Sequence, residues 1–198
     1  MAKKFLAVLA SSVVVAAASA QAAVINIEAG QPTVNVPAFD TANDLYRIFA
    51  DTFGVSGDIV FQNVLASGGN VLDDVNVIVL QNADDDDNSA TAFNARSAAT
   101  LIANNTNADR AGFFVYFNSV LNINRLVFTP NLNDALAAFT ILAANQSPTG
   151  ADAIALLPTF SVANFEFSEV PLPGALPLFI AGLGAGGLAA ARRSRKPA

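Results

Sequence analysis

The sequence predicts a single β-rich α+β domain with one or two helices, preceded by a secretory signal peptide and followed by a short transmembrane helix. Three observations lead to this prediction. Apolar runs rich in β-branched and aromatic residues alternate with turn-forming segments through the middle of the chain, which is typical of strands. Two longer segments place apolar residues at helical spacing. Both ends of the chain are apolar and basic, unlike the acidic middle.

The first 22 residues have the three parts of a secretory signal peptide. Lys3 and Lys4 precede an apolar run from Phe5 to Ala18, and small residues then allow cleavage after Ala20 or Ala22. A buried or membrane-spanning helix is the alternative, but the run is shorter than the roughly 20 residues that a span needs. We therefore expect signal peptidase to remove this segment during export.

The domain is expected to occupy residues 24–169, and its first part predicts a strand, an edge segment and a helix. Residues 24–30 carry apolar side chains at every second position, which predicts a strand. Two prolines within residues 31–39 predict an edge strand or a loop, because proline cannot donate to a sheet ladder. Residues 41–54 predict a helix that ends at Gly54. That helix depends on four apolar residues at helical spacing: Leu45, Ile48, Phe49 and Phe53.

The next part predicts a hairpin, a strand and a second helix. Ser-Gly-Gly-Asn at 67–70 favours a tight turn between two apolar runs, and the second run predicts a strand over 75–81. Residues 90–104 predict a helix capped by Asn88 or Ser89. A strand-helix-strand crossover is therefore expected between residues 75 and 117.

The remaining segments predict strands. Residues 112–118 are apolar on both faces, which indicates a central strand. Residues 123–129 and 136–145 predict two further strands, separated by a turn, and residues 161–167 close the domain. The chain has 15 phenylalanines, and seven of them lie within these four strands. We expect them to build a core rather than a binding platform.

The charge of the chain is unevenly distributed. All 16 acidic residues lie between Glu28 and Glu169, where the only basic residues are four arginines, so this part has a net charge of −12. Because nucleic-acid affinity depends on Lys and Arg releasing counterions, this charge excludes a nucleic-acid-binding domain. The chain has no cysteine, which excludes a disulfide framework and thiol catalysis.

Four consecutive aspartates, Asp84, Asp85, Asp86 and Asp87, form the densest acidic cluster. Carboxylates that are followed by amide and hydroxyl side chains supply the hard oxygen ligands that Ca²⁺ prefers, so this loop is a candidate calcium site. Its spacing is not that of an EF-hand loop. The alternative is a solvated loop whose charges stabilise the positive N-terminus of the following helix.

The residues do not predict an enzyme. Asp73 and Asp74 form a carboxylate pair, but glycoside hydrolysis requires a defined separation in space that neighbours in sequence do not establish. Residues 54–58 lack the Gly-x-Ser-x-Gly spacing of a nucleophile elbow, and the chain has no histidine to act as its base. We therefore expect a non-catalytic protein without a cofactor, for which Ca²⁺ is the one candidate ligand.

The C-terminal segment has three parts in order. Val-Pro-Leu-Pro-Gly at 170–174 is followed by an apolar stretch over 175–191 and by a basic cluster of Arg192, Arg193, Arg195 and Lys196. A helix of this length rises about 25 Å, enough to span a thin bilayer. The basic cluster acts as a stop-transfer signal and keeps its end cytoplasmic, which places the middle of the chain outside. An ordinary anchor that is never cleaved is the alternative.

A Pro-x-Pro element, a short glycine-rich apolar helix and an Arg-rich terminus, in this order, resemble the PEP-CTERM sorting signal of Gram-negative bacteria. The resemblance covers roughly residues 170–197, and a leucine stands where the namesake motif has glutamate. It implies recognition by an exosortase, a multi-pass membrane cysteine protease and transpeptidase. It also implies a link to extracellular polysaccharide and biofilm. The implied recognition element is Val170, Pro171, Leu172, Pro173 and Gly174.

These features together predict an exported, non-catalytic protein of the cell surface or the extracellular layer. It is expected to be anchored in the membrane before processing, and its expected partners are signal peptidase, the exosortase and extracellular polysaccharide. A Ca²⁺-assisted carbohydrate-binding module that uses the loop at 84–87 is the second interpretation. A secreted hydrolase is the third.

Overall fold

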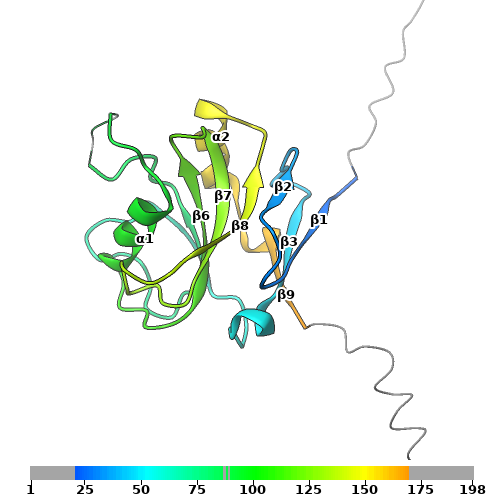
Figure 1. Cartoon of the computed structure of the whole chain (residues 1–198), viewed down its shortest axis with the longest axis horizontal. Coiled ribbons are helices and arrows are strands. Elements are labelled where there is room, and N and C mark those ends of the chain that lie inside the picture. Colours follow the sequence, from blue (N-terminus) through cyan, green and yellow to red (C-terminus); the bar gives the residue numbers. More distant parts are fainter. Residues whose placement is uncertain (1–20, 87, 89, 170–198) are drawn as a thin grey trace, which may run out of the picture.

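The computed structural model describes residues 21–86, 88 and 90–169, which form a sheet-rich α+β domain with two α-helices (Figure 1). The fold class predicted for the middle of the chain is confirmed. The predicted signal peptide lies outside these residues apart from its last positions, and the predicted transmembrane helix lies outside them entirely. Within the described part of the chain, no helix is both long enough and apolar enough to cross a membrane.

The larger sheet has six strands in the order β2-β8-β7-β6-β5-β4. β7 pairs antiparallel with both of its neighbours, and the remaining pairs are parallel. All seven residues of β6 are buried, which confirms the predicted central strand. In sheet order the strands are Val34–Val36, Thr140–Asn145, Ile123–Thr129, Gly112–Asn118, Val77–Leu80 and Phe61–Val64.

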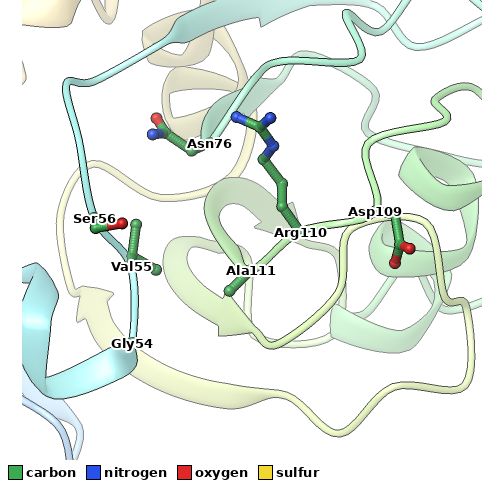
Figure 2. Close-up of a pocket in the computed structure, with 7 residues that line it drawn as sticks. All are labelled: Gly54, Val55, Ser56, Asn76, Asp109, Arg110 and Ala111. Carbon is green, nitrogen blue, oxygen red and sulfur yellow. The ribbon is translucent and has the colours of Figure 1, made fainter.

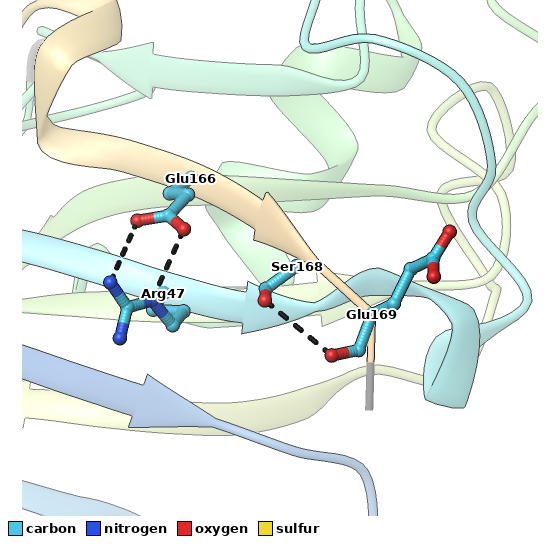
Figure 3. Close-up of polar contacts among 4 residues, drawn as sticks. All are labelled: Arg47, Glu166, Ser168 and Glu169. Carbon is cyan, nitrogen blue, oxygen red and sulfur yellow. Dashed lines mark hydrogen bonds and ion pairs between the residues drawn. The ribbon is translucent and has the colours of Figure 1, made fainter. Parts of the chain in front are cut away.

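The smaller sheet is wholly parallel and consists of β1 (Val24–Ile27), β3 (Leu45–Phe49) and β9 (Phe165–Ser168), with β3 in the centre. Its outer face carries the ion pair between Arg47 and Glu166, whose side chains lie opposite each other in register with a closest N–O distance of 3.2 Å (Figure 3). Both side chains are more than a third exposed, so this pair adds little stability.

The helix predicted over residues 41–54 is wrong. Residues 45–49 form strand β3, and within residues 41–54 only Ala50–Phe53 are helical, as a short 3₁₀ helix called η1. Tyr46 and Ile48 also alternate with less buried neighbours, so the segment fits a period of two as well as a helical one. Pairing with β1 on one side and β9 on the other decides between the two. The predicted stop at Gly54 is confirmed, because this residue caps η1 with a φ of 70°.

The hairpin predicted around residues 67–70 is also wrong. The glycine turn exists, with positive φ at both Gly68 and Gly69, but β4 and β5 run parallel. The segment between them crosses one face of the sheet, where Val71 and Val75 are buried in the core. A tight turn specifies only a local reversal of the chain. Burial of Val71 and Val75 against the sheet instead returns the chain to the end at which β4 begins, so that β5 runs parallel to β4.

Helix α1 (Ala95–Ala103) joins the parallel strands β5 and β6, which confirms the predicted crossover. It begins later than predicted, because Asn94 is its N-cap and accepts hydrogen bonds from the backbone of Arg96 and Ser97. The second helix, α2 (Gly150–Leu156), was not anticipated. Its seven residues are too few to show a helical period in the sequence. Two 3₁₀ turns, η2 (Leu157–Thr159) and η3 (Val162–Asn164), connect it to β9.

The large sheet is covered on both faces, by α1 on one side and by the small sheet on the other (Figure 1). Side chains of strand β6 alternate between the two hydrophobic cores, one on each face of the large sheet. Phe113, Val115 and Phe117 point between the sheets, while Phe114 and Tyr116 point toward α1. Other phenylalanines from η1, β7 and β9 pack around Phe113. The prediction that phenylalanines build the core is confirmed.

Buried tyrosine makes the folded state sensitive to alkali. Tyr46 is fully buried, and its hydroxyl donates to Asn145 Oδ1 at 2.5 Å. Burial raises the pKa of Tyr46 far above its ordinary value, and burial also raises the pKa of Tyr116. In the unfolded chain both phenols ionise near the ordinary value of about 10. The unfolded state therefore loses its protons first.

We expect the free energy of unfolding to fall as the pH rises above about 10, because the stability that depends on a neutral Tyr46 is fully present only below the unfolded pKa. Urea unfolding at a series of pH values measures this. Tyr46→Phe should make the alkaline decrease shallower, even though it lowers stability at neutral pH. An equally steep decrease in that variant would assign the effect to other groups.

Candidate functional site

A pocket of about 350 Å³ lies where β4, β5 and β6 begin, and we call it the Arg110 pocket (Figure 2). One wall is the loop after η1, with Val55 and Ser56. The other wall is the segment that leads into β6, with Arg110 and Ala111 (Figure 2). The complete lining is Gly54, Val55, Ser56, Asn76, Asp109, Arg110 and Ala111.

Backbone contacts hold the polar side chains of this pocket in place. Arg110 Nη1 donates to the carbonyl oxygen of Asp74 at 2.9 Å, and the guanidinium reaches across the pocket toward Asn76 (Figure 2). The Asn76 side chain is buried and fixes the loop before β4, since it accepts from Val60 N at 2.8 Å and donates to the Asp58 carbonyl at 2.9 Å. The sequence alone predicts no functional role for Arg110 or Asn76.

Asp109 lies at the rim of the pocket, and one of its carboxylate oxygens accepts from Asn131 Nδ2 at 2.7 Å. Ser56 is exposed on the opposite wall. The pocket thus brings together the Arg110 guanidinium and the Ser56 hydroxyl, whereas the Asp109 carboxylate points away from the Ser56 wall (Figure 2). The guanidinium and the hydroxyl can donate to an oxygen-rich ligand, and the hydroxyl can also accept from it.

A second pocket of about 280 Å³ shares Val55 and Ser56 with the first, and we call it the exit pocket. Its other wall includes Phe167, Ser168 and Glu169 at the end of β9. Ser168 is the last residue of β9, and Glu169 is the last residue that the structure describes (Figure 3). The two pockets therefore lie at the end of the domain where the chain continues into the predicted sorting signal.

The acidic loop lies at the opposite end of β5, beyond the carboxyl end of that strand. Asp84, Asp85 and Asp86 can each place one carboxylate oxygen within 4.8 Å of the others. Asp84 Oδ1 already accepts the backbone N–H of Asp85 at 2.8 Å and of Asp86 at 3.2 Å, while Asp86 Oδ1 accepts that of Asn88. Asp87 lies outside the described residues.

The alternative predicted for this loop is wrong in its second part, the stabilisation of the following helix, although Asp85 and Asp86 are exposed as a solvated loop requires. Its described aspartates do not belong to the first turn of α1, which begins at Ala95, and the first turn of that helix contains no acidic residue. The N-terminus of α1 is satisfied by Asn94 instead. The described carboxylates instead shape the loop itself, as short-range acceptors for backbone N–H groups.

We expect calcium to raise the melting temperature by no more than about 2 °C, because exposed carboxylates that already accept backbone hydrogen bonds gain mainly screening. A true site at a hundredfold excess of Ca²⁺ over its dissociation constant would add about 2.7 kcal/mol. Thermal melts with CaCl₂, with MgCl₂ and with EDTA measure the difference. A larger shift that Mg²⁺ cannot reproduce, and that Asp84→Asn with Asp86→Asn abolishes, would contradict the expectation.

The other residues singled out in the sequence are dispersed or lie outside the described chain. The Asp73 carboxylate accepts the backbone N–H of Asn107 at 2.9 Å and thus ties two loops together. Ala22 is exposed ahead of β1, whereas Ala20 lies outside the described residues. The sorting element 170–174 and the basic cluster that begins at Arg192 also lie outside them.

Comparison with known proteins finds no match among protein-family models, curated proteins or solved structures. The residues of this chain and their geometry are therefore the only evidence for its function.

Proposed function

We propose that this protein is an exported, non-catalytic component of the cell surface or the extracellular layer, processed at its C-terminus and associated with extracellular polysaccharide. The observation that carries the proposal is the tripartite order of residues 170–198, which resembles the PEP-CTERM signal read by an exosortase. The signal-peptide pattern of residues 1–22 supplies the complementary half, because it directs the middle of the chain across the membrane.

The end of the folded domain is compatible with processing at this position. The described core is complete at β9, whose Phe165 is buried between the sheets and whose last residue is Ser168. The predicted sorting element begins at Val170, two positions after the last residue of β9.

A non-catalytic role is supported by the composition of residues 24–169. This part has no histidine, cysteine or lysine, so side-chain nucleophile and base pairs that need these residues are excluded. The cluster of Asp84, Asp85 and Asp86 favours one second candidate, a Ca²⁺-assisted carbohydrate-binding module. The calcium melts described above test that candidate.

The intact mass of the protein in its native host tests the proposal. Membrane and extracellular fractions are separated, and the mass of the mature chain is measured in each. We expect a product that lacks residues 1–22 or 1–20 at one end and the basic cluster at the other. A mature chain that keeps residues 192–198 would show an uncleaved anchor and would overturn the proposal.

A further inference from the structure

The charge of the domain restricts the kind of polysaccharide it can bind. With a net charge of −12 over residues 28–169, the domain repels acidic polymers. Two of its four arginines are also held by contacts within the molecule. They are Arg47, paired with Glu166, and Arg96, which donates to the carbonyls of Ala135 and Ala137.

The segments around the Arg110 pocket also carry a net negative charge. Its single guanidinium is outnumbered by the acidic residues of the segments that build it, which are Asp58, Asp73, Asp74 and Asp109. A carboxylate or sulfate ligand would meet net repulsion there. An uncharged ligand would not be repelled, and it could still form hydrogen bonds with the polar side chains of the pocket.

Those groups suit a polyol. A guanidinium has five N–H donors. Among the residues that the structure describes, Arg110 donates from Nη1 to the Asp74 carbonyl, so its other N–H groups are available to a ligand. Ser56 on the facing wall can both donate and accept. Neighbouring hydroxyls of a sugar ring need this mixture. The volume of about 350 Å³ also falls in the usual range for small-ligand pockets of roughly 300–1,000 Å³.

We propose that the Arg110 pocket binds one sugar unit of an uncharged polysaccharide, with Arg110 as donor and Ser56 on the facing wall. The inference deepens the proposed function and rests on its polysaccharide partner. The site requires no calcium, because the acidic loop follows the carboxyl end of β5 whereas the pocket lies before its first residue. Export and processing do not depend on it.

Retention of the full chain, in detergent micelles, on immobilised polysaccharides tests the inference. The uncharged probes are dextran, mannan and galactan, and the acidic counterpart is alginate. We expect retention on at least one uncharged probe, unchanged by EDTA, and weaker retention on alginate. Ser56→Trp, which fills the pocket, and Arg110→Met, which removes the donor, should each weaken binding at least tenfold.

Matched controls separate loss of the site from a general effect. Ser67→Trp places the same bulk on an exposed loop beyond the other end of β4, and Arg96→Met removes an arginine beside Phe139. Both should bind within twofold of the unaltered chain, and circular dichroism should show all four variants folded. Equal losses in the Ser56 and Ser67 variants would overturn the inference.

No retention on any uncharged probe, or stronger retention on alginate, would also overturn it. These outcomes are distinguishable from failure of the proposed function. A processed protein recovered with the extracellular polysaccharide would leave that function standing without this pocket, whereas an uncleaved anchor in the intact-mass measurement would not.

Discussion

Replacing Pro171 and Pro173 by alanine is expected to leave the protein in the membrane and uncleaved. The apolar segment over 175–191 still inserts in this variant, but the extended element that the processing enzyme would read is lost, because proline fixes φ and removes a backbone donor. Membrane fractionation and intact mass measure the result. The mature product should be absent or reduced at least tenfold.

A matched control uses two prolines within the domain. Pro32→Ala with Pro37→Ala changes exposed prolines that flank β2 and should be processed as the unaltered chain is. Cleavage of the Pro171 and Pro173 variant at the normal rate would show that the element at 170–174 is not the recognition signal.

Neutral replacement of the basic cluster is expected to fail in a different way. Without its four positive charges the C-terminus loses the barrier that keeps it cytoplasmic, so part of the protein should pass through the membrane whole. The distinct outcomes for the prolines and for the cluster separate a processing signal from a simple anchor. The replaced residues are Arg192, Arg193, Arg195 and Lys196.

Phe113→Ala is expected to lower the free energy of unfolding by about 3–5 kcal/mol, the usual cost of truncating a buried phenylalanine. Phe113 is fully buried in β6, and its ring lies 5.3 Å from that of Phe53, 5.4 Å from that of Phe128 and 5.7 Å from that of Phe167. Its removal leaves a cavity where η1, both sheets and the end of β9 meet.

Urea unfolding followed by circular dichroism measures this loss. Val120→Ala is the control, since Val120 is 65% exposed in the turn between β6 and β7 and should cost less than about 0.5 kcal/mol. A loss below about 1.5 kcal/mol for Phe113→Ala would mean that the two sheets do not depend on this aromatic contact.

The sequence alone was sufficient to predict a strand that is apolar on both faces. Residues 112–118 are apolar at successive positions, and such a strand can be stable only with both faces covered, as β6 is. The crossover through α1 followed from the helical spacing of residues 90–104 between two apolar strands. These patterns need no knowledge of what packs against them.

Only the tertiary structure decided the identity of β3 and the direction of β4. Residues 45–49 are compatible with both periods, so the choice depends on β1 and β9, of which β9 is more than 100 residues away along the chain. The turn at 67–70 likewise cannot specify whether β4 and β5 are antiparallel or parallel. That depends on the burial of Val71 and Val75 against the face that carries α1.

The candidate functional residues also fall into two groups, those predicted from the sequence and those that only the tertiary structure brings together. The predicted sorting element and acidic loop are contiguous runs, so the sequence by itself was enough to pick them out. The Arg110 pocket combines residues near positions 56, 76 and 110, which come together only because β4, β5 and β6 are parallel and begin at the same end of the sheet. Parallel alignment is a product of long-range pairing, which no local pattern encodes.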